Sequence, residues 1–136
     1  MVDENHLRNQ NAPLGCSLLA LLAVIGVGVI AAWAIGQDRR AAQYPGAAPI
    51  SSHSNYTALP YHFRWDNAYR TTDPFPRVYN WYSTGFNLGT EARANGRCIL
   101  LEGATEWLTM ARYTSVLLCD TPTERMIFVS RSTSLK

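Results

Sequence analysis

The residues of this chain that could hold a metal ion are its histidines and cysteines. Cys98, Cys119, His53 and His62 could together supply the four ligands of a structural zinc site. However, the chain contains no Cys-x-x-Cys pair, and no histidine stands at a usual spacing from another ligand. His6 is separate from them, on a polar arm that precedes a long apolar segment. We therefore expect no metal site and no covalently attached haem.

The residues that could perform acid–base or nucleophilic catalysis are also poorly placed. Glu102 and Glu106 could form a carboxylate pair on a helix, but on a strand they would stand about 13 Å apart. No Gly-x-Ser-x-Gly sequence occurs, and a nucleophilic serine or cysteine needs a base within hydrogen-bond reach. Gly85, Gly89 and Gly96 form no phosphate-binding loop. We predict that the protein is not an enzyme and has no cofactor of its own.

Cys98 and Cys119 both fall within predicted strands, and two interpretations of them stay open. They form a disulfide, which would indicate an oxidising compartment, or they are reduced and buried as small apolar residues. The region around them has very little Lys and much Tyr, Trp, Ser, Thr and Asn, as many exported domains do. Arg39 and Arg40 oppose this, because the positive-inside rule would place that flank in the cytoplasm. We favour an extracytoplasmic domain.

The most distinct pattern in the chain is a long segment without charge near its start. No charged residue occurs from Ala12 to Gly36, and the apolar run from Leu14 has 23 residues. At about 1.5 Å per residue it gives about 34 Å of helix, enough to cross a hydrocarbon core of about 30 Å. Trp33 lies near its far end, where indole rings prefer the membrane interface. We predict a polar arm over 1–12 and a transmembrane helix over 13–36 of a single-pass protein.

Two forms of N-terminal processing remain open for this segment. A cleaved signal peptide would have a shorter apolar region, although Ala31, Ala32 and Ala34 resemble a small-residue cleavage site. A pilin-type leader would be cut after Gly15, directly before the apolar helix. The acidic residue that such proteins carry near the start of the mature helix is missing here.

Small residues recur along the predicted transmembrane helix. Gly28, Ala32 and Gly36 are four residues apart and therefore share one face. Small side chains let a second helix approach closely, and such packing drives helix association in lipid. The alternative is that Gly and Ala are simply common in membrane spans. We predict that this face packs against another helix.

The segment after the helix is rich in proline and aromatic residues, and we predict an extended linker arm over 37–76. Ten large rings occur from Tyr56 to Phe86, within 31 residues. Two alternatives are that these rings form the sheet's own core and a membrane-interface belt, or that they stack on sugars. We expect part of this surface to need a partner, because contiguous exposed apolar patches mark interaction sites. The rings that we expect to bind a partner are Tyr61, Phe63, Trp65, Tyr69 and Phe75.

The remaining residues, 77–136, predict a small β-rich domain. Asn95-Gly96 is a strong hairpin signal, because both residues tolerate the positive φ of a tight turn. A short helix from Thr105 to Arg112 is the rival assignment there. We expect a small antiparallel sheet or partial barrel of about five strands. The segments that predict strands are 77–84, 86–93, 97–102, 106–111, 113–119 and 125–130.

One transmembrane helix with a small cofactor-free domain resembles the single-span accessory subunits of bacterial energy-transducing membrane complexes, such as alternative complex III. The resemblance is to architecture across the whole chain. It implies a non-catalytic subunit that stabilises or assembles a respiratory or photosynthetic electron-transfer complex, beside larger integral membrane subunits and the lipid bilayer. The net charge of +2 is scattered, so no nucleic-acid partner is expected.

Two other function classes stay open. One is a pilin-like or envelope-surface assembly component, which processing after Gly15 would indicate. The other is a membrane-tethered module that binds glycans or peptides through Trp65, Trp81 or Trp107.

Overall fold

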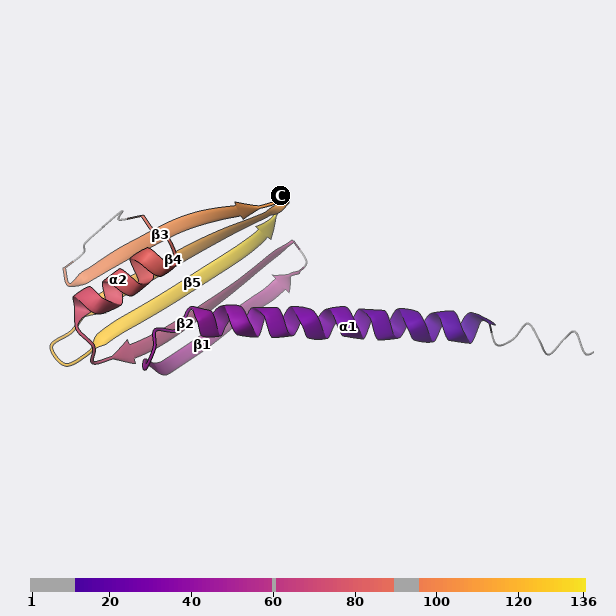
Figure 1. Ribbon diagram of the computed structural model, residues 1–136, viewed down its shortest axis with the longest axis horizontal. Helices are drawn as coiled ribbons and strands as arrows, with labels where there is room; N and C mark the ends of the chain where they lie inside the picture. The colour runs from indigo at the N-terminus through magenta and orange to yellow at the C-terminus, as the bar shows by residue number, and fades with distance from the viewer. Residues whose placement is uncertain (1–11, 60, 90–95) are drawn as a thin grey trace, which may run out of the picture. The chain divides into compact units, whose positions relative to one another are not determined.

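The computed structural model describes residues 12–59, 61–89 and 96–136, and the chain divides after Ala41 into an N-terminal helix and a sheet domain (Figure 1). Helix α1 (Ala12–Ala41) has 30 residues. Within its part from Gly15 to Ala41, a window of 18 residues reaches a mean hydropathy of 2.7, so the helix is long and apolar enough to cross a membrane. A signal sequence can share these features, and the helix is compatible with single-pass insertion. Arg39 and Arg40 lie in its last turn, where cations interact favourably with the helix dipole.

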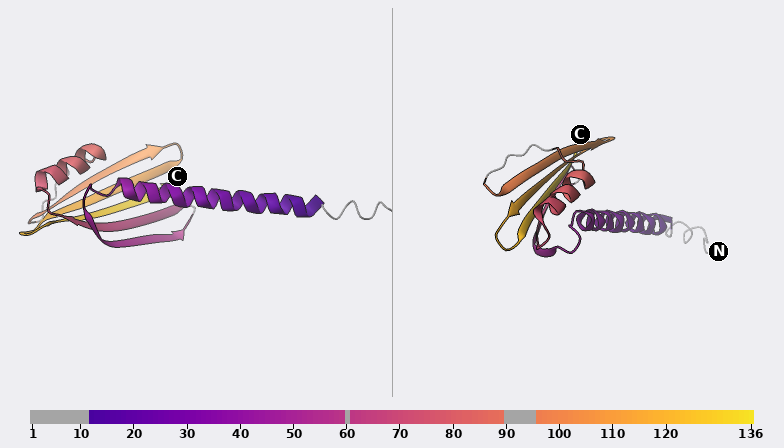
Figure 2. Two further views of the ribbon diagram at one scale, coloured as in Figure 1. Left: turned by 60° about the horizontal axis from the view of Figure 1, so that its bottom comes forward. Right: turned by 60° about the vertical axis from the view of Figure 1, so that its left-hand side comes forward.

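The sheet domain is an open antiparallel sheet of five strands with one further helix, which confirms the predicted fold class. The strand order is β1-β2-β5-β4-β3, so the last strand lies in the middle of the sheet, beside β2 (Figure 1). Helix α2 (Phe75–Gly85) follows β2 and lies over one face of the sheet (Figure 2). The strands are β1 (Ala48–Ala58), β2 (His62–Thr71), β3 (Cys98–Trp107), β4 (Met110–Asp120) and β5 (Arg125–Leu135).

The predicted linker arm over 37–76 is wrong for most of its length, because β1 and β2 occupy much of it. The domain accordingly begins at Ala42, not at residue 77. Strand β1 is exposed at nearly every position and includes Pro49, both of which an edge strand tolerates. Its polar sequence therefore lacks the alternation of apolar and polar residues by which a half-buried strand is recognised.

The predicted strand over 77–84 is also wrong, since these residues belong to α2. Pro76 lies in the first turn, where its missing N–H costs nothing. Val78 and Tyr82, one turn apart, are 1% and 0% exposed and face the sheet. Burial of this face overrides the β propensity of the sequence.

The remaining local predictions concern the rival helix from Thr105 to Arg112, the strand over 86–93 and the turn at Asn95-Gly96. The hairpin between β3 and β4 decides the first of them. It contains the residues of the rival helix from Thr105 to Arg112, so that helix does not form. Of the predicted strand over 86–93, Gly89 forms an isolated bridge with Glu102, and residues 90–93 lie outside the described part of the chain. Gly96 has the positive φ expected of a turn, whereas Asn95 lies outside the described residues.

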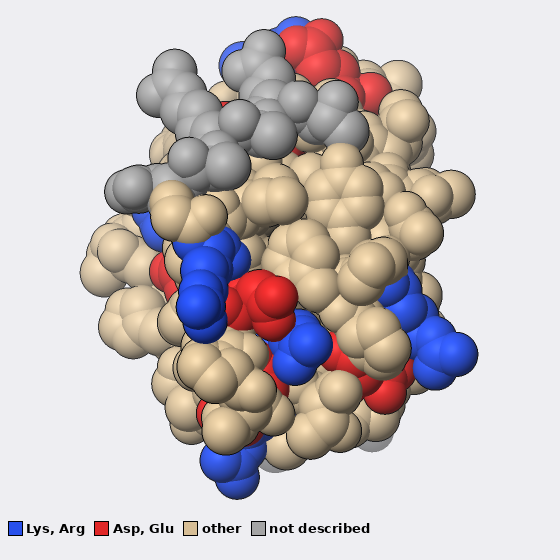
Figure 3. Space-filling view, turned by 90° about the vertical axis from the view of Figure 1, so that its left-hand side faces the viewer, with Lys and Arg blue, Asp and Glu red and all other residues tan. Residues whose placement is uncertain are grey.

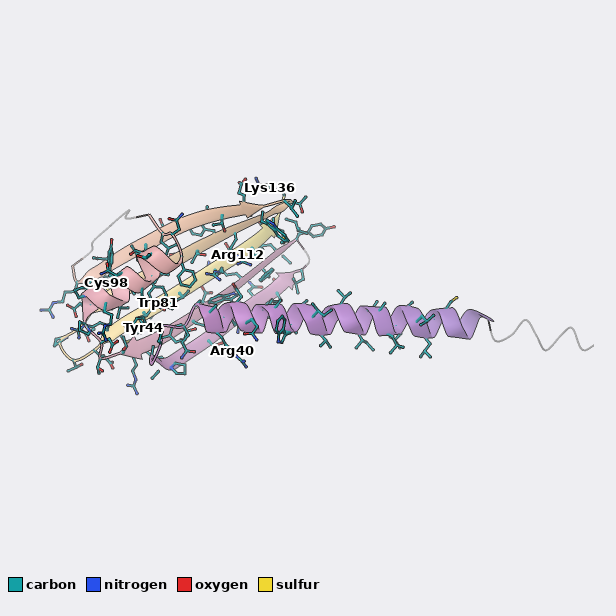
Figure 4. All side chains as sticks on the ribbon, in the orientation of Figure 1. Arg40, Tyr44, Trp81, Cys98, Arg112 and Lys136 are labelled. Atoms are coloured by element: carbon teal, nitrogen blue, oxygen red, sulfur yellow. A yellow bond between two sulfur atoms is a disulfide. The ribbon has the colours of Figure 1, made fainter. Side chains whose placement is uncertain are left out.

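The hydrophobic core lies between α2 and the sheet and includes the segment that leads out of α1. Ala42, Tyr44 and Ala47 are 0%, 4% and 5% exposed. The hydroxyl of Tyr82 donates to the carbonyl oxygen of Ala42 at 2.9 Å. Tyr44 packs edge-to-face against Trp81 with ring centroids 5.5 Å apart (Figure 4). The first residues after α1 are thus part of the folded domain.

Cys98 and Cys119 form a disulfide between β3 and β4. They stand directly opposite each other in the register. The N–H of Asp120 donates to the carbonyl of Arg97 at 2.8 Å, so the cysteines are the adjacent, non-hydrogen-bonded pair. Side chains approach most closely at such pairs. The alternative of two reduced cysteines is therefore not realised in this structure.

The end of the domain that carries the β4–β5 turn and the start of α2 is polar. Charges of both signs are interspersed there among uncharged residues (Figure 3). Most of the charged side chains are well exposed, so these ion pairs stabilise the fold little. The pairs are Arg70–Glu124 at 4.0 Å, Arg77–Asp73 at 3.6 Å and Arg125–Asp120 at 2.9 Å.

Candidate functional site

The most distinctive surface of the sheet domain is the face of the sheet opposite α2. Within the described part of the domain, α2 and the core cover one face only. On that covered face, Val116 and Ile127 are 0% exposed. On the other face, Phe128 is 41% exposed although it lies in the central strand. We call this second surface the open face.

An apolar row crosses the open face. Leu100 pairs with Leu117, Leu117 with Phe128, and Phe128 with Ala68. Four adjacent strands thus contribute one apolar side chain each, at the same level of the sheet. Leu100 and Leu117 are only half-buried. Ala68 is 6% exposed, so the exposed apolar surface of this row is that of Phe128 with parts of Leu117 and Leu100.

A polar row runs beside the apolar row, one pleat further along each strand. Its members also face each other across the strands: Glu102, Ser115, Ser130, Asp66 and His53. The open face therefore has an apolar centre with a charged and hydroxylated margin, the usual composition of a protein interface.

Asp66 is the charged centre of the polar row. The Arg64 guanidinium binds its carboxylate through Nε and Nη2, with distances of 2.9 to 3.2 Å. Partial burial acts to raise the pKa of Asp66, but hydrogen bonds from Arg64 and Ser130, with the charges of Arg64 and His53, lower it overall. The carboxylate thus stays ionised at neutral pH and is held in one orientation.

The order of groups in this row does not support nucleophilic catalysis. A catalytic serine needs a histidine within hydrogen-bond reach to accept its proton. Here Asp66 lies between His53 and Ser130, on the strand that separates theirs. Since neighbouring strands are about 4.8 Å apart, His53 and Ser130 are about 10 Å apart. Ser130 donates to the carboxylate and is not activated.

A shallow hollow of about 370 Å³ spans the two rows. Its volume is at the lower end of ligand pockets, which bury most of the ligand surface. Its floor is the apolar row, and Ser51, His53 and Arg64 stand at its margin. The hollow opens widely to the outside, which suits contact with a protein surface better than enclosure of a small molecule.

The predicted partner-binding rings lie mostly inside the domain. Trp65 is 0% and Tyr69 is 3% exposed, so neither is available to a partner. Phe63 and Phe75 are partly buried against the same core. Tyr61 alone of the five is well exposed, at 72%. For the buried rings, the alternative that they form the domain's own core is the one observed.

Of the tryptophans suggested for ligand binding, Trp81 is partly buried against the core, whereas Trp107 is 67% exposed at the β3–β4 turn. Glu102 and Glu106 lie on β3, at the separation expected of a strand. Within residues 12–59, 61–89 and 96–136, no three potential metal-ligating side chains lie together.

The predicted helix-packing residues lie on α1. A Cβ added to Gly28 or Gly36 would meet no atom within 4 Å. Packing within the described chain therefore does not require these glycines, and their predicted role toward another helix stays a prediction.

The open face was missed in the sequence, although a signal for it exists. Three strands contain consecutive apolar residues, which must point to both faces of the sheet. Such runs indicate strands covered on both faces, but α2 covers only one. The runs are 99–101, 116–118 and 126–129.

Comparison of the chain with models of protein families, with curated proteins and with solved structures finds no match.

Proposed function

We propose that this chain is a non-catalytic, single-pass accessory subunit that docks on a larger integral membrane protein and stabilises or assembles its complex. The observation that carries the proposal is the apolar row of Leu100, Leu117 and Phe128 on the open face. The other face of the same sheet is a complete core. Further apolar surface has no role within the described domain and fits a second protein.

A membrane anchor supports this proposal, because it would confine the domain to the same membrane as its partner. Two proteins in one membrane meet at a high effective concentration, so a modest surface suffices for stable association. The Gly28, Ala32 and Gly36 face of α1 offers a second contact, with a membrane helix of the partner. The partner that we propose is therefore an integral membrane subunit with an exposed domain or loop.

The compartment and the partner class are part of the proposal. The disulfide supports an extracytoplasmic domain, because disulfides persist in oxidising compartments. The architectural resemblance supports a respiratory or photosynthetic electron-transfer complex, in which the chain would carry no cofactor.

The test is purification of the native protein in mild detergent, followed by mass spectrometry of the proteins that accompany it. Phe128→Glu places a charge in the apolar row and should lower the yield of partner at least about tenfold, as expected for a central interface residue. Ile50→Glu is the matched control, because Ile50 is similarly exposed, at 47%, but lies on edge strand β1. A lone chain without partners, or equal yields from both variants, would refute the proposal.

The helix face has its own test in the same assay. Gly28→Leu with Ala32→Leu should weaken incorporation into the complex while membrane insertion is retained. Ile30→Leu is the control, since residue 30 lies on the opposite side of the helix from residue 28. Unchanged incorporation of the double variant would show that this face makes no contact.

A further inference from the structure

Three segments of the chain meet at one end of the sheet, opposite the end that carries the β4–β5 turn and the ion pairs described above. They are the β1–β2 loop, the β3–β4 turn and the end of β5. The N–H of Leu135 donates to the carbonyl of Tyr61 at 2.8 Å, and the N–H of Lys136 donates to that of Thr109 at 2.7 Å. Figure 4 labels Lys136 at this end.

The side chains that these segments expose are large and apolar, and we call them the apolar tip. Its most exposed members are Leu108, Tyr61 and Trp107, at 82%, 72% and 67%. None of these three can contribute much to the domain's own core. The apolar tip consists of Leu59, Tyr61, Trp107, Leu108 and Leu135.

The turn that presents two of these residues is costly for the fold. Leu108 has a φ of 53°, in the left-handed region that favours Gly and Asn. A leucine there is strained and gains no burial within the domain. Folding of the domain therefore does not explain why a bulky apolar residue occupies this turn.

We propose that the apolar tip inserts into the interfacial region of the bilayer that α1 spans. Trp and Tyr are the side chains that prefer the boundary between headgroups and acyl chains, and leucines of an interfacial surface enter the acyl region. Lys136 and Arg112 flank the tip with positive charge, which suits anionic headgroups. One positive charge is offset by Glu106, whose carboxylate lies 2.6 Å from the Lys136 ammonium.

The tether makes this contact reachable. Ala42 directly follows α1 and is buried in the domain, so no linker separates the two along the chain. Strand β1 has 11 residues and leads from the tether side to the tip. At about 3.3 Å per residue it spans about 36 Å, so the tip lies about one strand length from the tether. The proposal needs α1 in the bilayer but no partner subunit, and so goes beyond the proposed docking.

The test uses the full chain in phosphatidylcholine nanodiscs at one chain per disc, which excludes contact with a second copy. In a Cys16→Ser background, an environment-sensitive fluorophore is attached at Leu108→Cys or, as the matched control, at Thr123→Cys. Thr123 is exposed in the turn at the opposite end of the sheet. Quenching by nitroxides near the lipid headgroups should be at least about threefold stronger at 108 than at 123, as interfacial insertion requires.

Equal quenching at the two positions, together with full access of aqueous iodide to position 108, would overturn the proposal. A measurement without a label guards against disturbance of the turn. The fluorescence of Trp107 is obtained by subtracting the fluorescence of the Trp107→Phe variant from that of wild type. Brominated lipid should quench this difference. If the fluorescence of Trp107 is not quenched, the apolar tip lies in water, and the proposed membrane contact is wrong. Nanodiscs with added phosphatidylserine should raise the quenching only modestly, because the apolar residues dominate.

Discussion

The hydrogen bond between Tyr82 and Ala42 offers the sharpest test of how the segment that follows α1 is held in the domain. Both residues are 0% exposed, and the phenol donates to the carbonyl at 2.9 Å. Tyr82→Phe keeps the buried ring and its contacts with Trp81 and Phe86, whose centroids lie 4.6 and 5.8 Å away. The substitution therefore removes the hydroxyl, which donates to Ala42 and accepts from the backbone N–H of Tyr44, without leaving a large cavity.

The expected cost follows from the carbonyl that is left behind. A buried acceptor that loses its partner costs about 1–3 kcal/mol, and we expect Tyr82→Phe to lower the free energy of unfolding by about 1.5 kcal/mol. For a domain of 95 residues, this corresponds to a decrease in Tm of about 6–12 °C. The assay is thermal and urea unfolding of the full chain in mild detergent, followed by circular dichroism.

The pH dependence of the same variant gives a second, independent reading. Burial raises the pKa of Tyr82 well above its ordinary value of 10.0, with a smaller contribution from Tyr69. The phenol ionises in the unfolded chain before it ionises in the folded one. The contribution of this phenol to the free energy of unfolding of wild type is therefore fully present below about pH 10. It declines as the pH rises further, by up to about 1.4 kcal/mol per pH unit.

Phenylalanine cannot ionise, so the difference in unfolding free energy between wild type and Tyr82→Phe should shrink from pH 9 to pH 11. Tyr61→Phe is the control, because its ring is 72% exposed and the change should stay within about 0.5 kcal/mol. A Tyr82→Phe variant as stable as wild type at pH 7, or a difference that is constant across this pH range, would show that the phenol does not hold Ala42.

Three further outcomes are expected. Replacing both cysteines, Cys98→Ala with Cys119→Ala, opens a loop of sequence separation 21 and should lower the free energy of unfolding by about 3 kcal/mol. In wild type, mass spectrometry after alkylation of the denatured, unreduced protein should find only one free thiol. Gly103→Ala places a Cβ 2.9 Å from Cδ2 of buried Leu88 and should lower the unfolding free energy by about 1–2 kcal/mol, so a neutral effect would contradict the close approach. Leu108→Gly should relieve the positive φ and raise the unfolding free energy in detergent by about 0.5–1 kcal/mol, while abolishing lipid contact at this residue; a loss of stability would mean that the leucine packs within the domain.

The parts of the fold that sequence predicts well are those where one local property dominates. A charge-free run sets the position of α1, and the alternating or wholly apolar segments of β3, β4 and β5 set three strands. Strand β1 escapes such reasoning because an edge strand exposed on both faces needs no apolar residues. Helix α2 escapes it because the four-residue spacing of Val78 and Tyr82 matters only once a sheet exists to bury them.

The candidate surfaces show the same limit. The number of rings from Tyr56 to Phe86 correctly indicates much aromatic surface, but not which rings are exposed. Trp65 is buried because β2 lies second from the edge and faces α2. The surfaces that remain open, Phe128 on the sheet and Trp107 at the turn, depend on strand order and on which face α2 covers. Neither follows from local sequence.

The way in which Ala42 to Ala47 is folded into the domain has a consequence for how the protein can be released. Many membrane-tethered domains are shed when a protease cuts an unstructured stalk, but here Ala42, Tyr44 and Ala47 are buried in the core of the domain. A protease would have to open this packed segment or cut within α1.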